Sequence, residues 1–270
     1  MASFTETELQ GWRRNAAHYD ALCLPATSQA FQPVLDALGD IRKRAVLEMA
    51  CGTGHLARLL SVKGAHVTAI DFAPEMIELA RREAPAVTFK EADCERLPFA
   101  DDSFEGVACC FGALHFERPD AVFSQAYRVL KPGGKFVFTI WRGPEDGGEF
   151  LGMILAVYQL HADMNVNLPA GPAMFDLADE ARTTERLTRI GFEDTVSRDF
   201  DVVWSAPNPR GVSEIVELGM VRTRMILDLQ TPQRRKAILQ AIEDRARQHS
   251  GEGPFRMKSG VRLFSAMNPR

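Results

Sequence analysis

The fold of this chain is decided by one segment, Val46-Leu47-Glu48-Met49-Ala50-Cys51-Gly52-Thr53-Gly54-His55. An apolar run ends in a glycine-rich turn, and the turn leads directly into a segment with helical patterning. Gly52 and Gly54 lack a Cβ, so the backbone of this turn can approach a ligand closely. A second apolar run ends in Asp71, whose carboxylate can accept hydrogen bonds from both hydroxyls of a ribose. The pattern therefore predicts a nucleoside-binding α/β domain.

Around this segment, short apolar runs alternate with amphipathic stretches, which predicts parallel strands connected by helices on both faces of one sheet. The predicted strands are 45–49, 66–71, 87–90, 104–110, 135–141, 200–204 and 261–265. The predicted helices are 55–63, 75–84, 120–130, 150–161, 176–190 and one that begins at 231–232. The first 40 residues are also expected to be helical, with one apolar stripe made of Leu9, Trp12, Ala16, Tyr19 and Cys23. Residues 131–134 predict a turn.

The composition is that of a folded globular protein without basic character. Acidic residues number 36 and basic residues 32, which leaves a formal charge of −4. A dedicated nucleic-acid-binding protein is normally basic on at least one face, so we expect no nucleic-acid partner. The N-terminus lacks the pattern of a secretory signal, and the apolar stretch 150–160 is shorter than the about 20 residues of a membrane helix. We therefore predict no integral membrane association.

The cysteines and histidines show no metal-binding spacing. The cysteines are Cys23, Cys51, Cys94, Cys109 and Cys110. This odd set without a C-x-x-C pair predicts reduced thiols and a cytoplasmic location. Neither the histidines nor the cysteines have zinc-type spacing, so we predict that no metal is bound.

A nicotinamide cofactor is one candidate for the glycine-rich turn. Gly52, Gly54 and Ala57 match the G-x-G-x-x-[GA] pattern of dinucleotide-binding enzymes. Tyr127 and Lys131 also have the spacing of the catalytic pair of short-chain dehydrogenases. The proline after Lys131, however, disfavours a helical conformation there. An NAD(P)-dependent oxidoreductase therefore remains the alternative function.

Glu48 favours a different nucleoside. A carboxylate beside the turn repels a pyrophosphate and attracts the amino group and sulfonium of S-adenosylmethionine. The segment 48–54 resembles the E/D-x-G-x-G-x-G first motif of the Rossmann-like S-adenosylmethionine-dependent methyltransferases, with Ala50 in place of the first glycine. Four further blocks match in order, at 69–76, 91–99, 102–105 and 128–134. Together they are similar to the group that includes the ubiquinone and menaquinone biosynthesis C-methyltransferases, over about residues 42–142 and more weakly over 175–204.

This resemblance implies the fold class and a division of the chain. The expected fold is α/β: a Rossmann-like, seven-stranded, mostly parallel sheet with helices on both faces, an N-terminal helical lid and a helical substrate cap. Residues 1–40 would form the lid and residues 41–145 the S-adenosylmethionine-binding core. Residues 146–270 would supply the remainder of the core sheet with inserted substrate-cap helices.

The resemblance also implies which residues contact the methionine part of S-adenosyl-L-methionine. Glu48 would hold the amino group, and the turn Ala50, Cys51, Gly52 and Gly54 would pack against the cofactor.

The adenosine part would be bound from the ends of the next two strands. Asp71 would accept from the ribose hydroxyls, and Phe72 and Met76 would cover the adenine. Asp93 would accept from the adenine amino group, and the backbone N–H of Cys94 would reach a ring nitrogen.

The resemblance implies roles, with alternatives, for four further residues. The carbonyl of Cys110 or of Phe111 would face the methionine amino group. Tyr19 resembles a lid tyrosine, with plain helix packing as the alternative. His115 is a candidate general base, with contact to the cofactor and a purely structural role as alternatives.

The implied reaction is in-line methyl transfer to a small, partly apolar acceptor, with S-adenosyl-L-homocysteine as product. O- or C-methylation is slightly favoured, because Cys109-Cys110-Phe111-Gly112 stands where amino-group methyltransferases have N/D-P-P-[FYW]. A methyltransferase-like binding protein without transfer activity is a further alternative. Transfer to RNA or protein is disfavoured by the acidic balance. A monomer or homodimer is expected.

Two groups of later residues are candidates for the acceptor site. The expected apolar walls, with ordinary core packing as the alternative, are Phe150, Met153, Val157, Met174, Phe175, Trp204, Met220 and Met225. A group of arginines could face an anion, although interspersed acids favour a solvated surface for Arg222, Arg224, Arg234 and Arg235.

Overall fold

The computed structural model describes residues 2–270, which form two compact units. The sheet unit contains residues 30–141, 171–200 and 261–270, and the helical unit contains residues 2–29, 142–170 and 201–260. This division crosses the predicted range 1–40, because the helix at Phe31–Leu38 packs on the sheet through Val34, Leu35 and Leu38. The roles assigned to 1–40, 41–145 and 146–270 stay a prediction.

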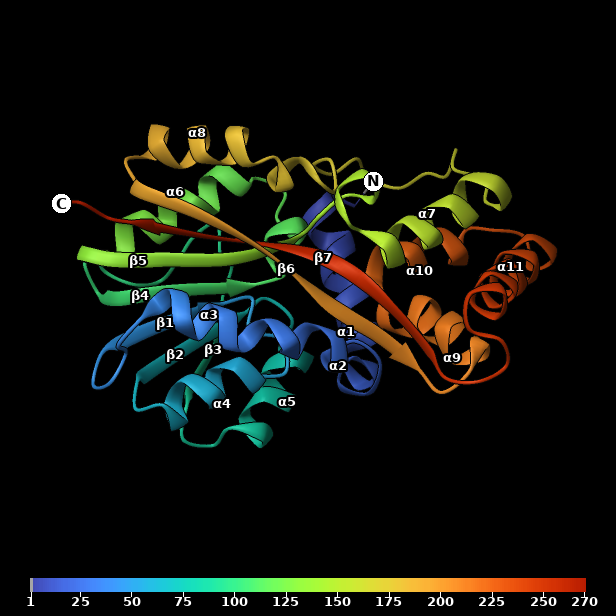
Figure 1. The fold of residues 1–270 in the computed structure, drawn as a ribbon. Coiled ribbons are helices and arrows are strands. Elements are labelled where there is room, and N and C mark those ends of the chain that lie inside the picture. The colour runs from blue at the N-terminus through green and yellow to red at the C-terminus, as the bar shows by residue number, and fades with distance from the viewer. Residues whose placement is uncertain (1) are drawn as a thin grey trace. The chain divides into compact units, whose positions relative to one another are not determined.

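One seven-stranded sheet is the centre of the sheet unit (Figure 1). Its strands are β1 Ala45–Met49, β2 His66–Asp71, β3 Thr88–Glu91, β4 Phe104–Cys110, β5 Leu130–Trp141, β6 Glu193–Ala206 and β7 Phe255–Met267. The order across the sheet is β3-β2-β1-β4-β5-β7-β6. β1 pairs in parallel with β2 and β4, and β7 runs antiparallel to β5. The predicted fold class, a seven-stranded, mostly parallel α/β sheet, is confirmed.

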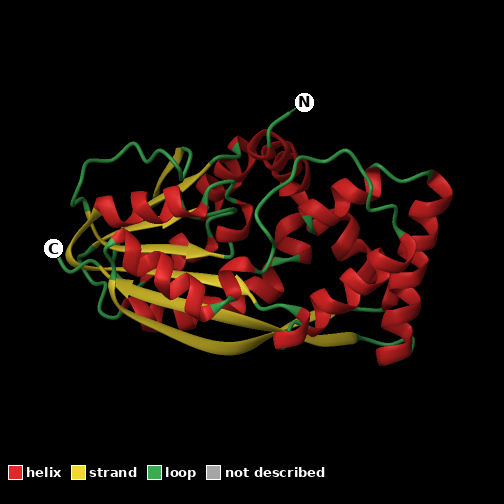
Figure 2. Ribbon diagram, turned by 90° about the horizontal axis from the view of Figure 1, so that it is seen from above, coloured by secondary structure: helices red, strands yellow, loops and turns green. Residues whose placement is uncertain are grey.

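Helices cover both faces of this sheet (Figures 1 and 2). They are α3 Phe31–Leu38, α4 His55–Val62, α5 Pro74–Glu83, α6 Pro119–Val129 and α8 Glu180–Ile190. Leu47 and Met49 of β1 belong to the apolar cluster that includes residues of α6 and α8, whereas Val46 belongs to the cluster with α3, α4 and α5. Alternate side chains of a strand point to opposite faces, so β1 is buried on both sides. This explains why its sequence is an almost continuous apolar run.

Two predicted elements in the sheet unit are wrong. The predicted turn at 131–134 is the irregular start of β5, where Phe104 pairs with Leu130 and the register then shifts. The predicted helix 176–190 is a 3₁₀ turn, Asp176–Ala178, followed by α8. Asp179 separates the two because its side chain caps α8 by accepting from the backbone N–H of Arg182.

The helical unit is built from six α-helices and one π-helical turn within residues 2–270. They are α1 Phe4–Leu22, α2 Leu24–Thr27, α7 Glu149–His161, α9 Pro209–Glu214, the π turn Ile215–Gly219, α10 Val221–Asp228 and α11 Pro232–Ser250. The buried rings of Phe150 and Trp204 stack with their centroids 4.7 Å apart. Val157, which belongs to α7 like Phe150, is also buried. These three predicted acceptor walls are therefore core residues. No helix in the described chain is both long and apolar enough to cross a bilayer.

The buried face of α1 differs from the predicted apolar stripe. It is made of Phe4, Glu8, Gly11, Asn15 and Ala16, whereas Leu9 and Trp12 are only half-buried. The prediction counted apolar residues, but α1 buries two polar side chains that meet arginines of α10. A polar residue can lie inside when a partner compensates its desolvation, and sequence patterning alone does not show the partner.

Candidate functional site

The predicted cofactor residues of the sheet unit gather at one edge of the sheet. β2, β1 and β4 are neighbours and parallel, so their carboxyl ends lie side by side. Loops after these ends form the common ligand position in open α/β sheets. Backbone contacts tie the loops together: the N–H of Cys51 donates to the carbonyl of Ile70 at 2.9 Å, and the N–H of Gly52 donates to Asp71 Oδ2 at 2.9 Å.

The turn after β1 is held in a left-handed backbone conformation. Ala50 has φ 52°, Gly52 has φ 52° and Gly54 has φ 84°. A Cβ on Gly54 would lie 2.8 Å from the Cβ of Ala80 in α5, so this glycine is required by the packing between the turn and α5. The approach of a ligand to the backbone of Gly54 stays a prediction, and no atom lies within 4 Å of the Cβ position at Gly52.

Ala50 is the strained member of this turn. A non-glycine residue in the left-handed region costs roughly 1–2 kcal/mol, which explains why a glycine is usual at this motif position. The methyl group of Ala50 also restricts the loop after β4, because a Cβ on Gly112 would lie only 2.5 Å from it. Backbone strain of this kind is concentrated at functional sites.

Glu48 is the main electrostatic feature of this edge. Its side chain is 3% exposed, and Oε2 has no hydrogen-bond partner among the described residues. Burial raises the pKa of this carboxyl well above its ordinary value, the negative charge of Asp71 raises it further, and the backbone N–H of Ala57 lowers it. An unpartnered buried carboxylate oxygen costs free energy unless a cation or donor reaches it. The site therefore suits a positively charged group.

Asp71 closes the neighbouring loop. It accepts from the N–H groups of Gly52 and Ala73 at 2.9 and 3.0 Å, and burial raises its pKa although these bonds oppose the shift. An ionised carboxylate has about four acceptor positions, so it can still accept from ribose hydroxyls. Phe72 is half-buried beside it and Met76 is buried in α5.

The end of β3 supplies the predicted adenine contacts. Asp93 is exposed and accepts from the N–H of Glu95 at 2.8 Å, which fixes the loop as a tight turn. Cys94 is buried, and the backbone of Ala50 lies within hydrogen-bonding reach of its thiol. These residues therefore lie beside the turn after β1, as their predicted roles require.

The end of β4 contains a second left-handed residue. Phe111 has φ 58°, its N–H donates to Thr139 Oγ1 at 3.0 Å, and its ring stacks on Trp141 with centroids 4.1 Å apart. Thr139 also contacts the thiol of Cys110 at 3.5 Å. The sequence analysis missed Thr139, although a hydroxyl residue within the apolar run 136–140 is a signal for it.

His115 lies on the same edge. It ends a 3₁₀ turn, Ala113–His115, and is half-buried. Its charge acts on Asp71 and lowers the pKa of that carboxyl. The structure thus brings His115 near the predicted ribose ligand, whereas its role as a base stays a prediction.

Two tyrosines that the sequence analysis considered have other surroundings. Tyr19 belongs to the helical unit, where its hydroxyl lies 3.2 Å from Thr27 Oγ1 and its ring meets Trp12 edge-on. Its lid role stays a prediction. Tyr127 packs on Phe192, and Lys131 forms an ion pair with Glu105. Both members of the dehydrogenase-like pair therefore have structural partners.

Comparison with known proteins agrees with this geometry. Residues 46–134 match the family model described as a methyltransferase domain. Glu48, Asp71, Asp93 and His115 all lie within this matched stretch.

Similar proteins extend the comparison over part of the chain. A demethylmenaquinone methyltransferase of Renibacterium salmoninarum is 34% identical over 128 residues, which are 47% of this chain and 54% of that protein. Another, of Thermus thermophilus, is 40% identical over 119 residues, covering 42% of this chain and 53% of that protein. The chain thus spans about half the length of the curated relatives that it matches. The expected similarity to the ubiquinone and menaquinone methyltransferase group is confirmed for the methyltransferase domain.

A solved structure shows the same fold over more of the chain. The YcgJ protein of Bacillus subtilis superimposes with a TM-score of 0.59 at 17% identity, over 90% of this chain and 99% of that one. A likeness at 17% identity shows a shared fold and carries no function.

The strain at Ala50 predicts an unusual mutational effect. Ala50→Gly should stabilise the protein by about 0.5–1 kcal/mol, because glycine adopts the left-handed conformation without the Cβ penalty. The matched control is Ala17→Gly at an exposed position of α1, which should destabilise by about 1 kcal/mol. Urea unfolding measures the change in the free energy of unfolding for both variants. A loss of stability in Ala50→Gly contradicts the assignment of strain.

The raised pKa of Glu48 predicts a pH dependence of stability without ligand. The folded state holds this proton more tightly than the unfolded state, so the contribution of Glu48 is present below its ordinary pKa of 4.5 and is lost as pH rises through the raised folded-state value. Thermal unfolding across pH should show a smaller loss of stability for Glu48→Gln than for the wild type. The exposed Glu193→Gln is the control and should follow the wild type. Identical profiles for all three proteins would contradict a raised pKa at Glu48.

Proposed function

We propose that this protein transfers the methyl group of S-adenosyl-L-methionine to a small, partly apolar acceptor by in-line displacement. The observation that carries the proposal is Glu48, a buried carboxylate with an unpartnered oxygen, in a stretch that matches a methyltransferase domain. A cationic amino group satisfies that oxygen, whereas a pyrophosphate brings further negative charge beside Asp71 and Glu48. The NAD(P)-dependent alternative is therefore not favoured.

The residues at the sheet edge fit the cofactor group by group. Glu48 would hold the amino group, Asp71 the ribose hydroxyls, and Asp93 with the Cys94 backbone the adenine. The backbone of Gly52 offers a surface that no side chain covers within 4 Å of its Cβ position. These assignments are supported by the shared edge of β1, β2, β3 and β4.

The chain's own part in the reaction would be binding and alignment. S-adenosylmethionine supplies an electrophilic methyl group on a sulfonium, so displacement needs no enzyme-bound intermediate. Burial raises the pKa of Cys110 to about 12, which leaves this thiol protonated at neutral pH and unsuited to act as a nucleophile. The hydrogen bond from Phe111 to Thr139 fixes the loop that faces the methionine part, and fixed loops reduce the entropy cost of alignment.

The acceptor class is proposed from the relatives. Several of the similar proteins are named demethylmenaquinone methyltransferases. A quinone-type acceptor is therefore the first class to test. The proposed methylation is at oxygen or carbon. The matched stretch 46–134 covers no part of the helical unit. Incubation with labelled cofactor and a metabolite extract, followed by mass spectrometry of the labelled product, decides the acceptor class.

The location, the partner class and the oligomeric state are proposed in the same way. All five cysteines are free and four are buried, which supports a reducing, cytoplasmic location. The formal charge of −4 supports a small-molecule acceptor over a nucleic acid. A monomer or a homodimer is compatible with these features.

Cofactor choice gives the sharpest test of the proposal. Titration calorimetry should detect binding of S-adenosylhomocysteine and none of NAD⁺. Glu48→Gln should weaken the first by at least about tenfold, because a charge-assisted hydrogen bond becomes a neutral one. Glu193→Gln is the matched control and should bind like the wild type. Binding of NAD⁺ in place of S-adenosylhomocysteine would refute the proposal.

The role of His115 is separable from cofactor binding. If it is the general base, His115→Asn should lower turnover by about 10²–10⁴-fold while the affinity for S-adenosylhomocysteine stays unchanged. The acidic limb of the pH–rate profile should disappear in the same variant. His66→Asn, at an exposed position at the start of β2, is the control. Weakened S-adenosylhomocysteine binding with normal turnover at saturation assigns His115 to the cofactor instead, and the base role is then abandoned.

A further inference from the structure

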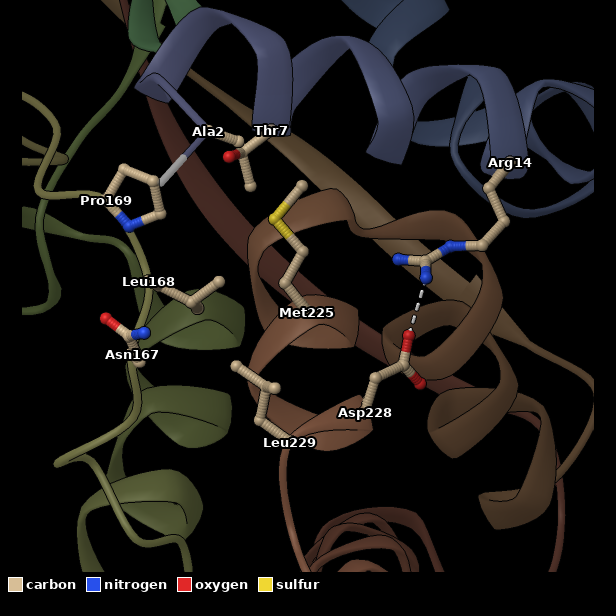
Figure 3. Close-up of a pocket in the computed structure, with 9 residues that line it drawn as sticks. All are labelled: Ala2, Thr7, Arg14, Asn167, Leu168, Pro169, Met225, Asp228 and Leu229. Atoms are coloured by element: carbon tan, nitrogen blue, oxygen red, sulfur yellow. Dashed lines mark ion pairs between the residues drawn. The ribbon is translucent and has the colours of Figure 1, made fainter.

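The helical unit contains a cavity of about 520 Å³ that shares no lining residue with the proposed cofactor site (Figure 3). Its apolar walls are Leu168, Pro169, Met225 and Leu229. Arg14 of α1 and Asp228 of α10 form an ion pair at one end, on the side away from Leu168. Pockets of about 300–1,000 Å³ with an apolar lining and few polar groups are typical of small-molecule sites. The cavity therefore has the size and lining of a ligand site.

The wall opposite α10 is held in place by hydrogen bonds. At one end, Gln230 accepts from the N–H of Asp163 at 2.8 Å and donates to its carbonyl at 3.0 Å. At the other end, Arg222 donates to the carbonyl of Pro169 at 3.2 Å. The segment 163–169 is thus fixed at both ends, so a ligand binds without first ordering this wall.

The polar end of the cavity carries an excess of positive charge. Asp228 lies 2.7 Å from Arg14 and 2.7 Å from Arg235, and Arg224 lies 3.9 Å from the same carboxylate. Glu217 pairs with Arg235 at 2.6 Å and is the second acid of the group. Three guanidinium groups therefore share two carboxylates, which leaves a surplus of one positive charge. The side chains of Arg14 and Asp228 are 40% and 33% exposed, so water screens part of this surplus, and the remaining positive charge attracts an anion.

The neighbouring buried groups do not remove the surplus. Arg222 faces the fully buried Glu8 at 3.6 Å, so that pair is balanced. Asn15 is fully buried and accepts from Arg224 at 3.0 Å, which holds the guanidinium without neutralising it. Burial lowers the pKa of Arg224, and the charge of Arg14 lowers it further. This shift therefore reflects burial first and the positive charge of Arg14 second.

The expectation of a solvated arginine surface is wrong for three of the four residues. The side chains of Arg222, Arg224 and Arg235 are 34%, 18% and 29% exposed. Only Arg234, which pairs with Asp163, is 46% exposed. The interspersed acids are the partners of these arginines across helices, and linear spacing alone did not show that.

We propose that this cavity binds a small amphipathic monocarboxylate, with its apolar body against Leu168, Met225 and Leu229 and its carboxylate on Arg14. A guanidinium has five N–H donors, so Arg14 can hold the ligand and keep Asp228. One surplus charge matches a monoanion, whereas a phosphate dianion would reverse the imbalance. None of the lining residues is a proposed cofactor residue, and binding here does not require methyl transfer.

Three probes of equal chain length test the charge preference. Titration calorimetry of the full chain with decanoate, 1-decanol and decyltrimethylammonium, below micelle formation, compares an anion, a neutral head and a cation. Decanoate should bind at least about tenfold more tightly than either of the others. Equal affinities for the three probes, or no binding of decanoate, overturn the proposal.

Variants locate the binding in the cavity. Arg14→Gln should remove the preference for decanoate, and Arg14→Lys should retain most of it because the charge remains. Asp228 keeps Arg235 as a partner in both variants. Leu229 is 50% exposed, so Leu229→Glu should leave the fold intact and weaken decanoate binding by repulsion. Unchanged decanoate affinity in Arg14→Gln and Leu229→Glu overturns the assignment.

Matched controls separate this site from the cofactor site. Arg13→Gln removes a charge from the exposed neighbouring position of α1 and should leave decanoate binding unchanged. Glu48→Gln should weaken S-adenosylhomocysteine and leave decanoate unaffected. A parallel loss of both ligands in Glu48→Gln contradicts an independent site.

Discussion

A buried carboxylate without a cation is the constraint around which the sheet edge is organised. Glu48 is the one charged residue of β1, and it lies among strands that are apolar on both faces. Burial and the nearby Asp71 both disfavour its ionised form. Removing such a group from water is costly unless a ligand with a positive charge compensates it. A cationic group that reached Glu48 would compensate this cost.

Backbone strain accompanies this charge at the neighbouring strand ends. Ala50 follows β1 and Phe111 follows β4, and both have positive φ values. The two loops are in contact, because a Cβ added to Gly112 would lie only 2.5 Å from the methyl group of Ala50. Strained loops persist when their surroundings over-determine them. Here the hydrogen bond from Phe111 to Thr139 and the stack on Trp141 provide that support.

The sheet and its ligand edge could be predicted from the sequence because their signals are local. A buried parallel strand is a continuous apolar run, and the turn after β1 is marked by Glu48 and two glycines. Parallel neighbours then bring their carboxyl ends together without further information. The same logic placed Asp71, Cys94 and His115 at one edge, although the chemical role of each still depends on the ligand.

The helical unit was harder to predict because its determinants are long-range. Glu8 and Asn15 are buried only because arginines more than 200 residues later compensate them. Thr139 looked like an ordinary strand residue, and its function as a hydrogen-bond acceptor depends on the left-handed Phe111 of another strand end. Apolar periodicity carries no information about such pairs. It therefore does not predict buried polar side chains or the side-chain hydrogen bonds that hold loops.

The account depends most directly on the partner of Glu48. A crystal structure of the protein with S-adenosylhomocysteine measures the distance from Glu48 Oε2 to the ligand's amino nitrogen. The account predicts a charge-assisted hydrogen bond of about 2.7–2.9 Å. An amino group bound elsewhere, with Glu48 Oε2 still without a partner, would contradict it.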